Sequence, residues 1–210
     1  MILLCGIPSE TPMRMVRDQL DALGADTIMF NQRDFARAAI SYEVSAQGIS
    51  GILRLNGFEI PLNEIRAVYV RMMDDRALPE MRELTDTSPE RAYCRGVHEA
   101  LTRWIEIAPA LVVNRCVAMA SNGSKPYQAQ LIRAQGFLVP ETLITSDPES
   151  LRAFRADYGR VVYKSISAVR SIVQTFGAAD EERLDQIRWC PTQFQAYVEG
   201  TDVRVHVVGE

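Results

Sequence analysis

No stretch of this 210-residue chain approaches the roughly 20 consecutive apolar residues that a membrane-spanning helix needs. The segment from Met1 to Gly6 is apolar, but it lacks a basic flank and leads directly into a turn. We therefore interpret it as a first strand and not as a signal peptide. These two absences predict a soluble protein without a membrane partner.

Cysteine and histidine are both scarce. The four cysteines lack the paired spacing of disulfide frameworks or zinc sites: Cys5, Cys94, Cys116 and Cys190. We therefore expect reduced thiols and a cytoplasmic location. His98 and His206 are the only histidines, so a histidine-rich metal site is not expected.

The chain also lacks an excess of positive charge. Its formal net charge is -4 at pH 7, which argues against bulk attraction to nucleic acid or to an anionic membrane. An anionic ligand would therefore have to be held by a few local cations. The remaining composition, 47% hydrophobic and 24% charged residues, is that of an ordinary globular protein.

The N-terminal half has the pattern of an α/β domain. Apolar strands at Ile2–Cys5 and Thr27–Phe30 flank a helical pattern, which is typical of a parallel α/β unit. Gly6 stands alone after the first strand, so the glycine-rich phosphate loop of a dinucleotide fold is missing. Asn56-Gly57 separates two alternating runs and predicts a hairpin.

A further strand, Ala67–Val70, is followed by Arg71. A charge at the carboxyl end of such a strand can line the crevice where open α/β sheets bind ligands. A solvated arginine at the rim is the alternative, and both interpretations stay open. Ser88-Pro89-Glu90 then begins the longest predicted helix, in which we expect Trp104 to be structural.

The C-terminal half carries lysines in informative places. Ser124, Lys125 and Pro126 combine a cap residue, a lysine and a helix-starting proline. Helix N-termini attract anions through unpaired amides and the helix dipole, so a lysine there costs some helix stability unless an anion lies nearby. The apolar run Val161–Tyr163 predicts a buried strand that delivers Lys164 at its end.

The last stretch, Phe194–Gly209, alternates polar and apolar residues around Glu199-Gly200. This pattern predicts a hairpin of two strands, with Asp202 and Arg204 two residues apart on one face. A lysine, an acid and an arginine at strand ends are the groups that a site for a phosphorylated ligand needs.

From Val112 to Gly209 the chain resembles the ATP-grasp ligases, especially the RimK-like branch that includes the peptide-modifying graspetide macrocycle ligases. Its motifs follow the family's order and spacing: Val113-Asn114, Ser124-Lys125, Gly136–Thr145, Val161–Lys164, Phe194–Val198 and Gly200–Arg204. The resemblance implies an α/β fold in three parts. These are a pre-ATP-grasp α/β domain at residues 1–115, a nucleotide-binding lobe at 116–198 and the incomplete beginning of a second lobe at 199–210.

The resemblance also implies roles for the charged residues. Lys125 and Lys164 would reach the phosphates of ATP, where two ammonium groups offset the ligand's negative charge. Asp202 would accept hydrogen bonds from the ribose hydroxyls. Arg204 would face the phosphates or an acyl-phosphate intermediate, which is the catalytic role.

The segment from Gln195 to Val198 is similar to the family's hinge between lobes. Gln195 would contact the nucleotide, and backbone groups of Ala196 and Val198 would read the adenine edge. Many relatives carry glutamate where this chain has Ala196. The loop Ser165–Ser171 departs further, because it contains no glycine, whereas many relatives close a glycine-rich loop over the phosphates.

The implied activity is that of an ATP-dependent ligase that joins a carboxylate to an amine or a hydroxyl through an acyl-phosphate. A peptide or an amino acid would be the substrate, Arg71 would dock its carboxylate, and a homodimer is plausible in this family. The family's Mg²⁺ ligands are an Asp, a Glu and an Asn on strands that would follow Glu210. We therefore expect a fragment of a protein about 100 residues longer, with weak or no turnover by itself.

Two other classes of function stay open. One is a degenerate ATP-grasp module that binds a peptide or a partner protein without catalysis, which the glycine-free loop and Ala196 favour. The other is a plain α/β domain whose lysines and arginines are solvated surface charges. The plain α/β domain predicts no nucleotide-dependent rise in melting temperature, because a nucleotide that binds the folded state must raise its stability.

Overall fold

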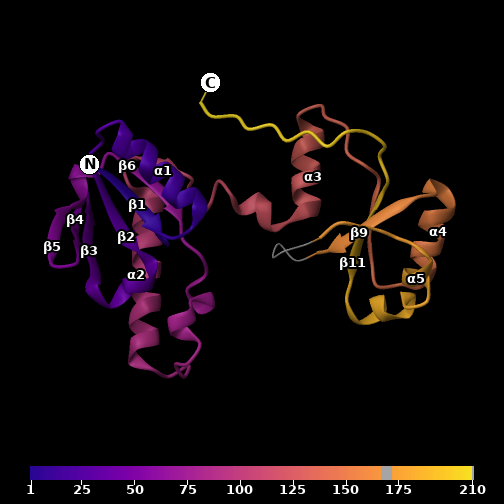
Figure 1. The fold of residues 1–210 in the computed structure, drawn as a ribbon, viewed down its shortest axis with the longest axis horizontal. Helices are drawn as coiled ribbons and strands as arrows, with labels where there is room; N and C mark the ends of the chain where they lie inside the picture. Colours follow the sequence, from indigo (N-terminus) through magenta and orange to yellow (C-terminus); the bar gives the residue numbers. More distant parts are fainter. Residues whose placement is uncertain (167–171, 210) are drawn as a thin grey trace. The chain divides into compact units, whose positions relative to one another are not determined.

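The computed structural model describes residues 1–166 and 172–209, and the chain divides into two compact units. Unit 1 is Met1–Met119 and unit 2 is Ala120–Glu210. Each unit combines a β-sheet with helices (Figure 1), so the mixed α/β class predicted from the sequence is confirmed. Within the described residues, no helix has both the length and the apolar character needed to cross a bilayer.

Unit 1 is built on a four-stranded parallel sheet with the order β2-β1-β6-β7. Its strands are β1 (Ile2–Gly6), β2 (Thr27–Asn31), β6 (Ala67–Arg71) and β7 (Leu111–Val113). Helix α1 (Thr11–Ala22) joins β1 to β2, and α2 (Pro89–Ile107) precedes β7. The order reverses between β1 and β6, and open sheets of this kind bind ligands outside the carboxyl ends of the strands at such a switch point.

A second, antiparallel sheet in unit 1 has the order β3-β4-β5. Its strands are β3 (Ala38–Ser45), β4 (Gly48–Leu55) and β5 (Phe58–Pro61). Between β4 and β5, φ is 51° at Asn56 and 85° at Gly57. Two successive positive φ angles are the mark of the type I′ turn that suits a tight hairpin. The hairpin predicted at this dipeptide is confirmed.

One apolar core joins both sheets of unit 1 to α2. Leu3 of the parallel sheet, Leu53 of the antiparallel sheet, and Leu101 and Trp104 of α2 are all fully buried in it. Trp104 is therefore structural, as predicted. Four short 3₁₀ helices complete the unit: Gln32–Arg37, Leu62–Glu64, Asp75–Ala77 and Pro79–Met81.

Unit 2 is organised around an antiparallel sheet with the order β10-β9-β11-β8. Its strands are β8 (Thr142–Thr145), β9 (Val161–Ser165), β10 (Gln174–Thr175) and β11 (Thr192–Ala196). Its helices are α3 (Lys125–Ala134), α4 (Pro148–Tyr158) and α5 (Ala178–Glu181), with 3₁₀ helices at Ala120–Gly123 and Leu184–Trp189.

The hairpin predicted around Glu199-Gly200 is wrong. β11 ends at Ala196, and residues 197–209 form no strand. The reason lies in the pairing of β11, which is hydrogen-bonded to β9 along one edge and to β8 along the other. A strand that folded back after Gly200 would find no free edge on β11 to pair with.

Two predicted helix starts are confirmed by their caps, Ser88 before α2 and Ser124 before α3. Asp147 stands in the same way immediately before α4. Each side chain accepts a hydrogen bond from a backbone N–H two or three residues later, at 3.1 to 3.4 Å. Such a cap satisfies a donor that the first turn of a helix leaves without a partner.

The C-terminal end of α2 is capped by an arginine from the following segment. Arg115 Nη1 donates to Glu106 O at 2.6 Å and also to Ile105 O. Its Nη2 donates to Ala108 O at 2.8 Å and to Ala110 O at 3.3 Å. Since the last carbonyls of a helix have no partner inside it and carry partial negative charge, one guanidinium satisfies several of them together.

Arg115→Met should therefore destabilise unit 1 by about 1–3 kcal/mol, because it leaves part-buried carbonyls without a donor. Urea unfolding followed by tryptophan fluorescence measures this loss. Arg103→Met is the matched control, because Arg103 is 77% exposed and reaches Glu99 only at 4.0 Å. Equal stabilities of the two variants would contradict the capping role of Arg115.

Candidate functional site

The sheet of unit 2 has one apolar and one more polar face. Val161 and Phe194 are buried in a core with Leu151 of α4 and Leu184. Because successive residues of a strand point to opposite faces, the alternate residues of β8, β9 and β11 line the other face. We call this the lysine face, and it comprises Thr142, Ile144, Val162, Lys164, Gln193 and Gln195.

The two predicted phosphate-binding lysines meet at the end of β9. Lys125, the first residue of α3, donates from Nζ to Ser165 O at 2.8 Å, and Ser165 follows Lys164 directly. They are also the only lysines in the chain, because the other 21 of its 23 basic residues are arginines. The sequence thus places its two compact, mobile cations beside one another.

The proximity of the two ammonium groups has an electrostatic consequence. Burial lowers the pKa of Lys164 below its ordinary value, and the positive charge of Lys125 lowers it further. Both effects disfavour the charged form of a lysine, whereas a bound anion would favour that form and so oppose both. The end of β9 therefore suits a ligand with several negative charges, such as a polyphosphate.

The segment Gln195–Val198 offers groups that could read a base. Gln195 Nε2 donates to Thr142 Oγ1 at 3.0 Å, which orients the amide on the lysine face. Ala196 N–H donates to Glu141 O at 2.9 Å, so its carbonyl is the backbone group left for a ligand. The N–H of Val198 makes no hydrogen bond within the described residues.

Asp202 and Arg204 lie in the extended segment that follows β11, and both are exposed. In the part of the chain that the structure describes, neither side chain forms a hydrogen bond or an ion pair. The shared strand face that the hairpin prediction required is absent from residues 197–209. No regular element in this segment fixes the two side chains relative to each other.

Arg71 lies at the carboxyl end of β6, at the switch point of the parallel sheet in unit 1. Its Nε donates to Glu10 Oε2 at 3.3 Å, and the two side chains are 41% and 36% exposed. Arg71 is therefore accessible, and a carboxylate from the loop after β1 already occupies one of its donors.

Gln193 was not singled out from the sequence. It is only 1% exposed, and its Oε1 is buried without a hydrogen-bond partner in the described part of the chain. The single signal in the sequence is the alternation Gln193-Phe194-Gln195, which places both glutamines on one face. Nothing in that pattern shows that Gln193 is buried.

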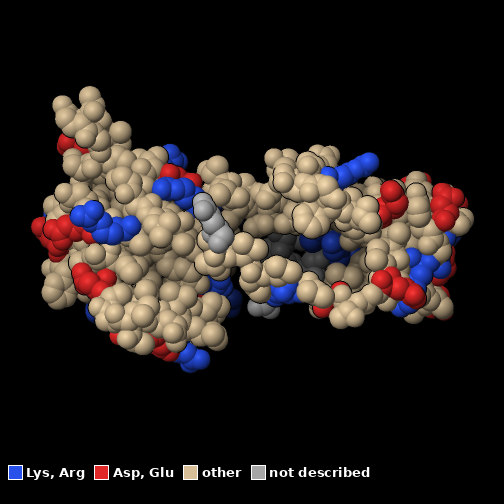
Figure 2. All heavy atoms as spheres, turned by 90° about the horizontal axis from the view of Figure 1, so that it is seen from above, with Lys and Arg blue, Asp and Glu red and all other residues tan. Residues whose placement is uncertain are grey.

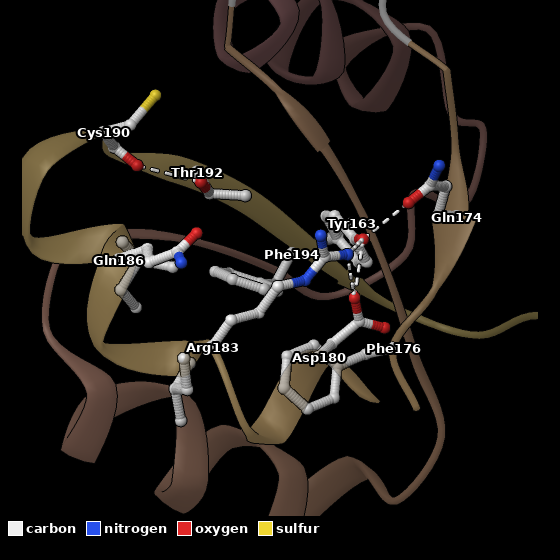
Figure 3. Close-up of a pocket in the computed structure, with 11 residues that line it drawn as sticks. Tyr163, Gln174, Phe176, Asp180, Arg183, Gln186, Cys190, Thr192 and Phe194 are labelled. Carbon is white, nitrogen blue, oxygen red and sulfur yellow. Dashed lines mark hydrogen bonds and ion pairs between the residues drawn. The ribbon is translucent and has the colours of Figure 1, made fainter. Parts of the chain in front are cut away.

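A cavity of about 320 Å³ lies on the opposite face of the sheet (Figure 3), and Tyr163, Phe176 and Phe194 form its aromatic side. Arg183 Nη2 donates to Asp180 Oδ1 at 2.6 Å and to the Tyr163 hydroxyl at 3.2 Å. Because the sheet separates this cavity from Lys164, it is not part of the lysine face.

Two further expectations concern the phosphate end. Most of the glycine-free loop Ser165–Ser171 lies outside the described residues, so its closure over phosphates stays a prediction. Among residues 1–166 and 172–209, no three His, Cys, Asp or Glu side chains are grouped as metal ligands. The described residues thus bring together two ammonium groups, whose charge suits phosphates, but no group of three side chains of the types searched as metal ligands.

The surface charge is mixed: on the face seen in Figure 2, basic and acidic side chains are interspersed over both units.

No protein-family model matches the sequence, and no curated protein matches it. Solved structures do match. The ATP-grasp ligase PsnB, complexed with a minimal precursor, Mg and ADP, is 26% identical with a TM-score of 0.74, over 95% of this chain and 64% of that chain. The macrocyclase MdnC from Microcystis aeruginosa MRC, bound with its precursor peptide MdnA, is 20% identical with a TM-score of 0.72, over 93% and 68%.

A RiPP-associated ATP-grasp ligase from Chryseobacterium gregarium, in complex with ADP and a leader and core peptide, is also similar. It is 20% identical with a TM-score of 0.72, over 93% of this chain and 62% of that chain. The chain thus spans about two thirds of the length of these ligases. The resemblance found in the sequence is confirmed at the level of the fold: the chain has the ATP-grasp fold of peptide-modifying ligases.

Proposed function

We propose that the lysine face of unit 2 binds ATP, and that the protein is an ATP-dependent ligase that activates a carboxylate of a peptide. The observation that carries the proposal is the meeting of Lys125 and Lys164 at the end of β9, in a chain that has no other lysine. The ATP-grasp fold supports it, and so do the ADP and precursor peptides named for the similar ligases.

Each group on or beside the lysine face then has a role. Lys125 and Lys164 hold the phosphates, and their charges offset those of the nucleotide. The Ala196 carbonyl accepts from the adenine amino group and the Val198 N–H donates to a ring nitrogen, beside Gln195. This pairing agrees with the use of the Ala196 N–H inside the sheet.

Asp202 and Arg204 belong to the same proposal. Asp202 accepts hydrogen bonds from the ribose hydroxyls, and Arg204 faces the phosphates or the acyl-phosphate. Both roles require residues 197–209 to adopt a more fixed arrangement than the extended segment described above. In this proposal residues 1–115 are the pre-ATP-grasp domain, residues 116–198 the nucleotide lobe, and residues 199–210 the beginning of a second lobe.

The chemistry proceeds in two displacements. An oxygen of the substrate carboxylate attacks the γ-phosphorus of ATP, the bond to the β,γ-bridging oxygen breaks, and ADP leaves. An amine or a hydroxyl then attacks the acyl carbon, and inorganic phosphate leaves. The contribution of this chain is positioning and charge stabilisation at the phosphates. Magnesium, when bound, would neutralise phosphate charge.

Arg71 is the group that we propose for the substrate carboxylate. It stands at the switch point of the parallel sheet, and its contact with Glu10 shows that a carboxylate can reach its guanidinium. Planar guanidinium groups bind carboxylates well because two N–H groups can donate in parallel. The substrate would displace Glu10 from Arg71.

Ala196 favours a second function, a degenerate ATP-grasp module that binds a peptide or a partner protein without catalysis, because many of the ligases that the sequence resembles carry glutamate there. The two functions differ in whether a carboxylate becomes activated.

Lys164→Met should lower the affinity for ATP about 10- to 100-fold, because a charge-assisted hydrogen bond to phosphate is lost. The same substitution should raise the melting temperature of the nucleotide-free protein, since it removes an ammonium group that burial and Lys125 disfavour. Calorimetry and thermal unfolding measure the two effects. Arg188→Met is the control, because Arg188 is 60% exposed and forms an ion pair with Asp185 at 3.5 Å, away from the lysine face.

The lowered pKa of Lys164 also predicts how the stability of the protein changes with pH. The unfolded chain binds the Lys164 proton more tightly than the folded one, so stability should rise with pH between the lowered pKa and the ordinary lysine pKa. Lys164→Met should reduce this rise.

An unchanged affinity for ATP in Lys164→Met would contradict the assigned site.

Activation of a carboxylate can be tested without the natural amine. The protein is incubated with ATP, Mg²⁺, a pool of peptides rich in Asp and Glu, and hydroxylamine. A ligase converts the acyl-phosphate into a peptide hydroxamate with release of ADP and phosphate, and mass spectrometry detects that product. Formation of the hydroxamate would contradict the non-catalytic module, and robust turnover would also contradict the expectation that these 210 residues turn over weakly or not at all by themselves.

A further inference from the structure

We propose that Gln193 is a base-selecting residue, whose Oε1 accepts a hydrogen bond from the 6-amino group of the bound adenine. This inference rests on the proposed ATP site, and it assigns a residue that the sequence resemblance does not include. It starts from the burial of the Gln193 side chain and the lack of any partner for its carbonyl oxygen.

The burial of Gln193 is unusual for a polar side chain. The residue is 1% exposed, and its Oε1 has no partner among residues 1–166 and 172–209. A buried polar atom without a hydrogen bond costs free energy, so natural proteins rarely keep one without a reason. A bound ligand that donates to this oxygen would supply the reason.

The strand register locates the oxygen on the nucleotide side. Gln193 pairs directly with Lys164 on β9 and with Ile144 on β8, and the side chains of such cross-strand neighbours start only about 5 Å apart. Phe194, the next residue, points into the core on the other face. Gln193 therefore lies beside Lys164 across the strand pair, and Gln195 lies two residues further along β11 on the same face.

The chemistry of ATP then selects the partner. An amide oxygen only accepts hydrogen bonds, so its partner on ATP must be a donor. The phosphates and ring nitrogens of ATP only accept, and they therefore cannot pair with it. The donors of ATP are the 6-amino group and the two ribose hydroxyls, which the proposed function assigns to Asp202. The amino group has two hydrogens, and the Ala196 carbonyl uses one. The second is available to Gln193.

Gln195 is the competing glutamine on the same face, and its surroundings differ. Its Nε2 already donates to Thr142 Oγ1 at 3.0 Å, and the residue is only partly buried. Water can reach a partly buried amide oxygen, so Gln195 needs no ligand to satisfy it. The buried oxygen of Gln193 has the greater need of a donor from the ligand.

The test compares ATP with purine riboside triphosphate, which lacks the 6-amino group, on the protein and on Gln193→Leu. Calorimetry measures the affinity for each nucleotide. We expect Gln193→Leu to weaken ATP binding about 3- to 10-fold more than it weakens binding of the analogue, as for the loss of one hydrogen bond. Thermal unfolding shows that the variant is folded, and Gln193→Met is the second variant if it is not.

Matched controls separate the possible outcomes. Gln186→Leu changes a glutamine at the cavity on the opposite face and should alter neither affinity. Equal weakening of both nucleotides in Gln193→Leu would overturn the inference, since it would mean that the amide is structural or satisfied by water. Selective weakening in Gln195→Leu alone would overturn it as well. If neither nucleotide binds the unaltered protein, the proposed function itself fails.

Discussion

The end of β9 in unit 2 brings two positive charges together, an arrangement that by itself disfavours the folded state. Lys164 is placed at the end of a sheet strand, partly removed from water, and the only other lysine of the chain lies beside it. Neither the burial of an ammonium group nor a neighbouring like charge stabilises a folded protein. Such an arrangement is typical of binding sites, where the charge of the ligand offsets the charges of the side chains.

The antiparallel sheet separates two kinds of surface. One face holds the core formed with α4 and, beside it, the cavity of Figure 3, whose polar groups are hydrogen-bonded to one another. The other face holds Lys164 and, within the described residues, a buried glutamine oxygen without a hydrogen-bond partner. This difference between the two faces supports the nucleotide site that we propose on the lysine face.

Much of the fold could be predicted because the signals are local. Ser88, Ser124 and Asp147 cap helices through hydrogen bonds to residues two or three positions away, and a sequence window contains both partners. Asn56-Gly57 defines its turn by backbone angles alone. The two lysines were also found from local signals, a helix start and a strand end.

The predictions that failed depend on contacts between residues far apart in the sequence. The hairpin after β11 was wrong because β8 and β9 occupy both edges of that strand, and no local window shows this. Gln193 was missed because its alternation with Phe194 predicts a half-exposed strand residue, whereas tertiary packing buries it. Fold class and lysine positions thus followed from the sequence, and the pairing and burial that shape the site did not.

The central claim is that ATP binds at the two lysines, and the scarcity of lysine makes it directly measurable. The primary amines of the chain are Lys125, Lys164 and the α-amino group of Met1, which lies in unit 1 and serves as an internal standard for an amine-acylating reagent. Mass spectrometry gives the acylation rate at each amine with and without ATP. The account predicts that ATP slows acylation of both lysines and leaves that of Met1 unchanged. Equal rates with and without saturating ATP at both lysines would contradict it.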